Sequence, residues 1–187
     1  MQGFSAFHWL VVLLVIAFHA VPLYLAISRV RREKREGQGL TPGAKGWLFL
    51  LLWGLWVALI LYAVGMLSYY QGPDVGAAFG VIPGVMIVES VQNLLLGAAL
   101  VGVLVLATRR SRHFRWAWLV LAVATALNAP LNLWMVTDTL RRQDIAFDPL
   151  AELAPADVAR WLGTVLGLAL WTAYIFRSRR VALTFTR

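Results

Sequence analysis

The chain has 187 residues, of which 60% are hydrophobic and 14% are charged, and it contains no cysteine. This composition excludes an ordinary soluble domain, and the lack of cysteine excludes disulfides, thiolate metal sites and thiol catalysis. The formal net charge is +8, but the basic residues form short clusters between apolar runs. That arrangement indicates membrane topology rather than nucleic-acid binding.

Five apolar runs are each long enough to cross a hydrocarbon core of roughly 30 Å. In chain order they are Phe4–Ser28, Gly46–Ser68, Val85–Thr108, Trp116–Val136 and Ala156–Phe176. We therefore predict an all-α fold, a polytopic integral membrane bundle of five transmembrane helices. No basic segment precedes the first run, which favours an uncleaved helix over a signal peptide. Pro22 and Pro130 are expected to kink the first and fourth helices.

The segments between the runs are polar, and we expect no span in them. Residues 29–45 are basic, residues 69–84 contain no Lys or Arg, and residues 137–157 include a short surface helix expected at Pro149–Leu153. We divide the chain into an N-terminal transmembrane helix (1–28), a basic cytoplasmic linker (29–45) and a four-helix membrane domain with a basic tail (46–187).

The basic residues also set the expected orientation. Residues 29–45, residues 109–115 and the tail from Arg177 together hold fourteen Lys and Arg, whereas three lie in the remaining segments. Cytoplasmic segments carry the excess of Lys and Arg. We therefore expect the N-terminus outside, the C-terminus in the cytoplasm, and a location in a bacterial inner membrane.

The third run carries an unusual polar cluster. Glu89, Gln92 and Asn93 fall on one face of a helix, and an ionisable group in a spanning helix normally faces the protein interior and has a partner. The polar layer that we expect consists of Glu89, Gln92, Asn93, Asn128, Asn132 and Arg160. At 1.5 Å per residue from the basic ends, these side chains lie about 20–28 Å deep.

This layer has two interpretations. Its side chains either hold the helices together by hydrogen bonds or form a ligand, ion or proton site. An ion pair between Glu89 and Arg160 is central to both. Thr125 is expected on the same face as Asn128, and Thr164 on the same face as Arg160.

Small residues repeat every four positions in the last run. Ala159, Gly163 and Gly167 form this stripe, and Gly163 with Gly167 makes a GxxxG motif. We predict that Gly163 and Gly167 pack closely against another helix of the bundle, with homodimerisation as the alternative.

The sequence offers no catalytic, cofactor or metal site. It lacks a Gly-x-Ser-x-Gly elbow, a phosphate-binding glycine loop and an HExxH motif. His8 and His19 lie about 16 Å apart along a helix, too far to share one metal ion. We therefore expect a protein that is not an enzyme and that binds no cofactor and no nucleic acid.

Several short motifs resemble one family. They are Gly46-Trp47-Leu48, Glu89 with Asn93, the basic turn from Arg109 to Phe114, Trp171 with Tyr174, and the closing residues Arg177-Ser178-Arg179-Arg180-Val181 with Thr184-Phe185. From Gly46 onward, over about three quarters of the chain, the pattern resembles the bacterial membrane family DUF2569, a family of unknown function. The resemblance implies a four-helix core to which the first helix is an addition, and it implies no activity.

Two functions fit these observations. The first is a non-enzymatic accessory or assembly component whose partners are membrane lipids and, through helix packing, another membrane protein or a second copy of the chain. The second is a small transporter or sensor that uses the polar layer around Glu89. A small carrier would often show an internal repeat, and the absence of one in the sequence favours the first function.

Overall fold

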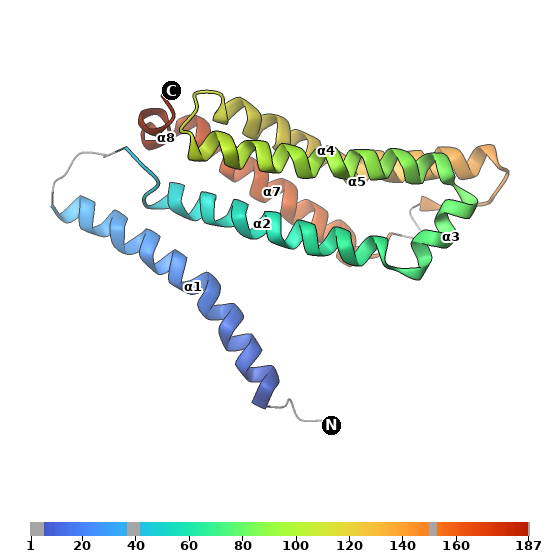
Figure 1. The fold of residues 1–187 in the computed structure, drawn as a ribbon, viewed down its shortest axis with the longest axis horizontal. Coiled ribbons are helices and arrows are strands. Elements are labelled where there is room, and N and C mark those ends of the chain that lie inside the picture. Colours follow the sequence, from blue (N-terminus) through green and yellow to red (C-terminus); the bar gives the residue numbers. More distant parts are fainter. Residues whose placement is uncertain (1–5, 37–41, 150–152, 187) are drawn as a thin grey trace.

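The computed structural model describes residues 6–36, 42–149 and 153–186, and every regular element in these ranges is a helix. Figure 1 shows how the helices are arranged. Their bounds are α1 Ala6–Arg35, α2 Trp47–Tyr70, α3 Pro73–Val81, α4 Pro83–Thr108, α5 Phe114–Arg142, α7 Pro155–Arg177 and α8 Arg179–Thr184.

Four of these helices, α2, α4, α5 and α7, are long and apolar enough to cross a membrane. They correspond to the second to fifth predicted runs, so the all-helical fold is confirmed and these four runs form helices with the length and composition of membrane spans. Helix α1 has 30 residues and contains most of the predicted first run. Both α1 and α5 continue through their internal prolines, Pro22 and Pro130.

The helices extend beyond the apolar runs that predicted them. Helix α1 continues through the basic segment to Arg35, where Arg32 and Glu36 form an exposed ion pair four residues apart. Arg, Lys and Glu favour helix, so the expected linker begins later than residue 29. Two short helices, α3 and α8, lie in segments where none was expected. The predicted helix at Pro149–Leu153 falls largely on residues outside the described ranges.

The spanning helices form an open arc. Among the described residues the packed pairs are α1 with α2, α2 with α4, α3 with α4, α4 with α5, α5 with α7, and α7 with α8. The spans therefore follow one another in the order α2, α4, α5, α7, and the two end helices of the arc are not a packed pair. Helix α1 lies outside the arc against α2 and diverges from it toward its N-terminus (Figure 1).

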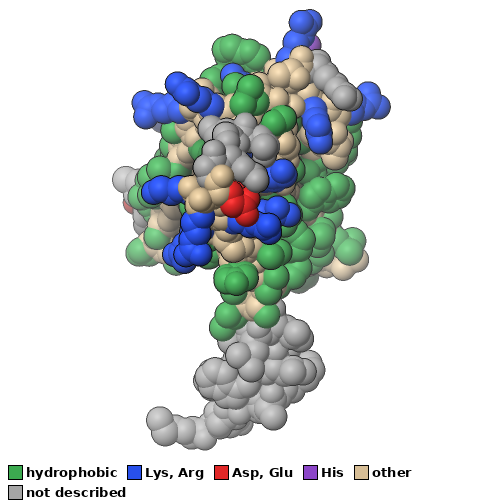
Figure 2. Space-filling model, turned by 90° about the vertical axis from the view of Figure 1, so that its left-hand side faces the viewer, with side chains coloured by type: hydrophobic (Ala, Val, Ile, Leu, Met, Phe, Trp, Pro, Cys, Tyr) green, Lys and Arg blue, Asp and Glu red, His purple; other side chains and the backbone are tan. Residues whose placement is uncertain are grey.

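The densest packing lies at one end of the molecule, which we call the basic end. It holds the C-terminal end of α1, the turn between α4 and α5, and α8 (Figure 1). Phe114, Ile175 and Val181 are fully buried there, and the ring of Phe114 stacks on that of Phe185 with centroids 4.1 Å apart. Figure 2 views this end and shows Lys and Arg side chains gathered over it.

A buried ion pair joins helices α1 and α8 at the basic end. Arg180 donates a hydrogen bond from Nη2 to Oε2 of Glu33, and their side chains are only 7% and 14% exposed. The segment before α2 packs on the same helix, because the backbone N–H of Gly43 donates to Oγ1 of Thr184 at 2.9 Å. Helix α8 thus holds three segments of the chain together.

Gly46 completes this junction, because its backbone adopts a conformation that other residues avoid. Its φ of 57° and ψ of −133° lie in a region that glycine occupies readily. A Cβ at this position would lie 2.8 Å from Cγ2 of Val30 and 3.4 Å from Nη1 of Arg180. The start of α2 can therefore approach α1 and α8 only with glycine at position 46.

We predict that Gly46→Ala destabilises the protein by about 1–3 kcal/mol, because it combines backbone strain with a steric clash at the junction. Reversible unfolding in mixed micelles measures this change. Gly65→Ala is the matched control, since Gly65 lies in helix α2 with nothing within 4 Å of its Cβ position. Equal stability of the two variants would contradict the prediction.

Candidate functional site

A cavity of about 690 Å³ lies where the arc is open. Its walls come from α2 and α7, and α4 and α5 contribute the rest of its lining. This volume is within the range of small-molecule sites, about 300–1,000 Å³. Residues from the four helices that line it include Leu51, Gly54, Ala58 and Tyr62; Leu96 and Leu100; Trp118, Leu121, Thr125 and Asn128; and Arg160, Trp161, Thr164, Leu168 and Trp171.

Helical periodicity explains how these residues reach the cavity. Thr125 and Asn128 lie three residues apart and both line it, as their shared face predicts. Arg160 and Thr164 do the same from α7. On α2 the small residues Gly54 and Ala58 are four positions apart, which leaves space that longer side chains would fill.

Three side-chain hydrogen bonds hold the helices that line the cavity. Between α5 and α7, Nε1 of Trp118 donates to Oγ1 of Thr172 and Nε1 of Trp161 donates to the carbonyl oxygen of Ala126, each at 2.9 Å. Between α2 and α4, the hydroxyl of Tyr62 donates to the carbonyl oxygen of Asn93 at 2.5 Å. These bonds join neighbours within the arc, so they fix the cavity walls without closing the space between α2 and α7.

The polar groups of the cavity gather toward the start of α7. Nη1 of Arg160 lies 3.0 Å from Oδ1 of Asp157, one turn before it, and the two side chains are 77% and 56% exposed. Oγ1 of Thr164 donates to the carbonyl oxygen of Arg160. An ion pair with this exposure contributes little to stability. The charges therefore remain accessible, and the rest of the lining is mostly apolar.

The structure divides the predicted polar layer into separate groups. Only Asn128 and Arg160 line the cavity. Glu89 lies by the end of α2, close to the side chain of Tyr69. Oε1 of Gln92 and Oδ1 of Asn132 are buried without a hydrogen-bond partner.

The predicted ion pair between Glu89 and Arg160 is wrong. Arg160 pairs with Asp157, and Glu89 interacts with Tyr69. The depth estimate placed both residues in the outer third of the membrane but carried no information on which helices are neighbours. Helices α4 and α7 are not a packed pair in the arc, because α5 lies between them in the packing order.

The predicted packing of Gly163 and Gly167 within the bundle is also wrong. Nothing lies within 4 Å of the Cβ position of either residue. The reason is that α7 is the last helix of the arc, and among the described helices it packs mainly on α5 and α8. Gly167 instead lines a smaller recess of about 380 Å³ together with Trp47, Trp171 and Tyr174.

The buried pair between Glu33 and Arg180 could not be predicted from the sequence. These residues are 147 positions apart, and each lies in a basic cluster that the positive-inside rule already explains. Asp157 was missed in the same way, as one of several acidic residues in a polar segment. In the described part of the chain no group of three His, Asp or Glu residues is placed to hold a metal ion.

The comparisons with known proteins identify the family. The chain matches the family described as "Protein of unknown function (DUF2569)" over residues 42–186 and belongs to it. The resemblance in its short motifs is thereby confirmed, and α1 lies before the matched region as an additional helix. No curated protein and no solved structure matches the chain significantly.

We predict opposite results for two double-mutant cycles. Glu33→Gln and Arg180→Gln should each cost about 3–5 kcal/mol and be strongly coupled, because either change leaves one buried charge unpaired. Glu89→Gln and Arg160→Gln should be additive, because these residues do not meet. Unfolding in mixed micelles measures both couplings. Coupling between Glu89 and Arg160 as large as that of the buried pair would contradict the structure.

Proposed function

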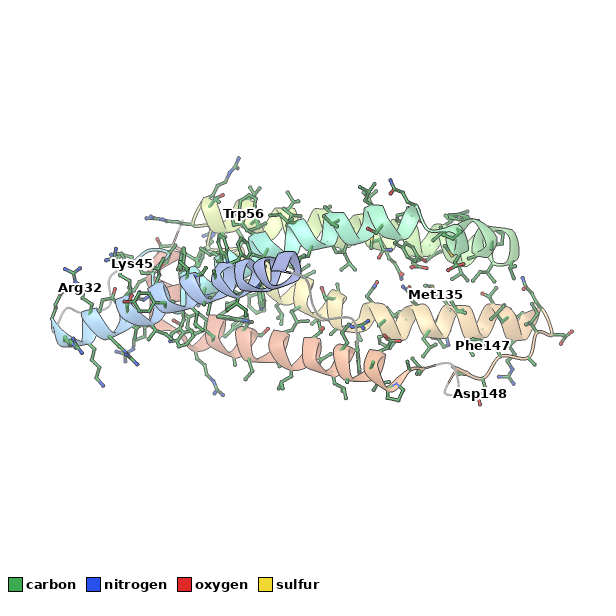
Figure 3. The ribbon with its side chains drawn as sticks, turned by 90° about the horizontal axis from the view of Figure 1, so that it is seen from below. Arg32, Lys45, Trp56, Met135, Phe147 and Asp148 are labelled. Atoms are coloured by element: carbon green, nitrogen blue, oxygen red, sulfur yellow. The ribbon has the colours of Figure 1, made fainter. Side chains whose placement is uncertain are left out.

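We propose that the chain crosses the bacterial inner membrane five times, with α1 as the first span, the N-terminus outside and the C-terminus in the cytoplasm. The clustering of Lys and Arg at the basic end supports this orientation (Figure 2). In Figure 3, Arg32 and Lys45 lie toward that end, whereas Met135, Phe147 and Asp148 lie toward the other.

Reporter fusions after residues 35, 74, 112 and 148 test this topology. We expect cytoplasmic reporter activity at residues 35 and 112 and external activity at residues 74 and 148, because the first two positions lie in basic segments. External activity at residue 35 alone would contradict the assignment of α1 as the first of five spans.

The function that we propose is a non-enzymatic accessory or assembly role, in which the protein packs against a transmembrane helix of another membrane protein. The observation that carries this proposal is the cavity between α2 and α7, at the open side of the arc. Small residues allow close approach of helices in a membrane. Gly54 and Ala58 supply them on the cavity wall, and no atom occupies the space beside Gly54 within 4 Å.

Helix α1 supports the same proposal. It packs on α2, where Phe18 contacts Trp53, and Pro22 and Ala26 of α1 are buried. The same helix carries exposed Val21, Tyr24 and Leu25. These exposed apolar side chains offer a surface for a partner.

A transporter or sensor is the second candidate, and the polar residues of the cavity favour it. Asp157, Arg160 and Asn128 line the same space as the apolar side chains. Such a site suits an amphiphile or a solute with a charged group.

We predict that Gly54→Leu reduces co-purification of the partner roughly tenfold, which corresponds to about 1.4 kcal/mol of lost packing. The new side chain would enter the cavity. The protein itself should fold normally, because nothing lies within 4 Å of the Cβ position. Quantitative pull-down from a mild detergent measures the ratio of partner to protein.

Gly65→Leu is the matched control, because Gly65 lies on the same helix, has equally open surroundings and does not line the cavity. Retention of the partner by Gly54→Leu would contradict docking in the cavity. A second copy of the chain as the only stoichiometric partner would replace the hetero-partner by a homodimer. If no partner is captured and an added amphiphile stabilises the native protein but not Gly54→Leu, the second candidate is correct.

A further inference from the structure

A separate pocket lies at the basic end, where α1, α2 and the junction of α7 with α8 meet. Its volume is about 300 Å³, and the residues that carry its chemistry are Glu33, Lys34, Trp47, Tyr174, Arg179 and Arg180. The cavity between α2 and α7 shares none of these residues. The site is thus distinct from the one discussed above.

Arg180 is the unusual residue of this pocket. It is only 6% exposed, and one arm of its guanidinium donates to Glu33. The other arm, Nη1, is buried and has no hydrogen-bond partner. A buried donor on a charged group that lacks an acceptor is costly. Nη1 lies 3.4 Å from the Cβ position of Gly46, so the charge of Arg180 is held at the start of α2, next to the pocket.

The charges of the pocket select an anionic acceptor. Glu33 is matched by Arg180, so Lys34 and Arg179 leave an excess of positive charge in the lining. Guanidinium groups bind phosphate oxygens through several parallel donors, and lysine binds them as a point charge. Phosphate is the group that fits this combination.

The surroundings of the pocket identify the source of the phosphate. Trp47 and Tyr174 line the pocket and also line the apolar recess that contains Gly167 and Leu170. A polar pocket and an apolar recess therefore share two aromatic residues. Trp47 opens a spanning helix and is 45% exposed, as expected of a residue at the level of the lipid headgroups.

We propose that this pocket binds the phosphate of an anionic glycerophospholipid, with an acyl chain of the same lipid in the recess beside Gly167. Lys34 and Arg179 bind the phosphate oxygens, and the buried Arg180 adds its positive charge beside them. The bound lipid links α1 to the junction of α7 and α8. The pocket thus binds one lipid at a defined site, whereas the basic clusters alone would attract anionic lipids only diffusely.

Native mass spectrometry of the full chain, exchanged from phosphatidylcholine into phosphatidylglycerol, tests the proposal. We expect one phosphatidylglycerol to be retained in a saturable way. Arg179→Gln should weaken retention roughly fivefold to tenfold, the effect of one lost charge-assisted contact. Arg112→Gln is the matched control: it removes one positive charge at the same end, and Arg112 does not line the pocket. It should leave retention unchanged.

Further arms of the experiment separate the alternatives. Arg180→Gln should abolish saturable retention, and if this variant fails to fold, the comparison of Arg179→Gln with Arg112→Gln decides. Equal weakening by those two variants would show diffuse attraction and overturn the proposal.

Stabilisation by inorganic phosphate as strong as that by phosphatidylglycerol would show a site for a free ion. In the lipid-bound protein, Gly167→Leu should lower retention by filling the recess, and unchanged retention would overturn the placement of the chain.

Discussion

The ion pair between Arg180 and Glu33 is the interaction on which the architecture of the basic end depends. A buried guanidinium requires a carboxylate close by, and this carboxylate comes from α1, at the other end of the sequence. The pair positions α8, and α8 in turn receives the N–H of Gly43 and places Phe185 on Phe114. The start of α2 can fit against these groups only because Gly46 has no side chain.

In the described residues, no buried ion pair comparable to that of Arg180 and Glu33 holds the rest of the helices together. No hydrophobic force closes an arc of helices in a bilayer, because lipid chains are as apolar as the side chains that they contact. Helices α2 and α7 are therefore held by their neighbours through Tyr62, Trp118 and Trp161, and the cavity lies between them. One end is packed like a soluble core, and the cavity borders this core, since Leu51, Leu55 and Trp118 belong to both.

Features that depend on a single helix were predicted correctly from the sequence. Predictions that required two particular helices to be neighbours were wrong. Apolar length located the four spans, and periodicity placed Thr125 with Asn128 and Arg160 with Thr164 on shared faces. It could not show that α5 separates α4 from α7, so Glu89 was paired with the wrong residue. Gly163 and Gly167 were assigned a neighbour for the same reason, although α7 ends the arc.

The position of Glu33 bears on how the additional helix relates to the family core. The matched region begins at residue 42, so Glu33 lies before it and Arg180 lies inside it. A core without α1 would keep a buried guanidinium with no carboxylate, and breaking such a pair from one side typically costs about 3–5 kcal/mol. Val30 also packs where a Cβ of Gly46 would lie. In this chain α1 and the family core are therefore one folding unit, because the charge that satisfies the core comes from the helix added to it.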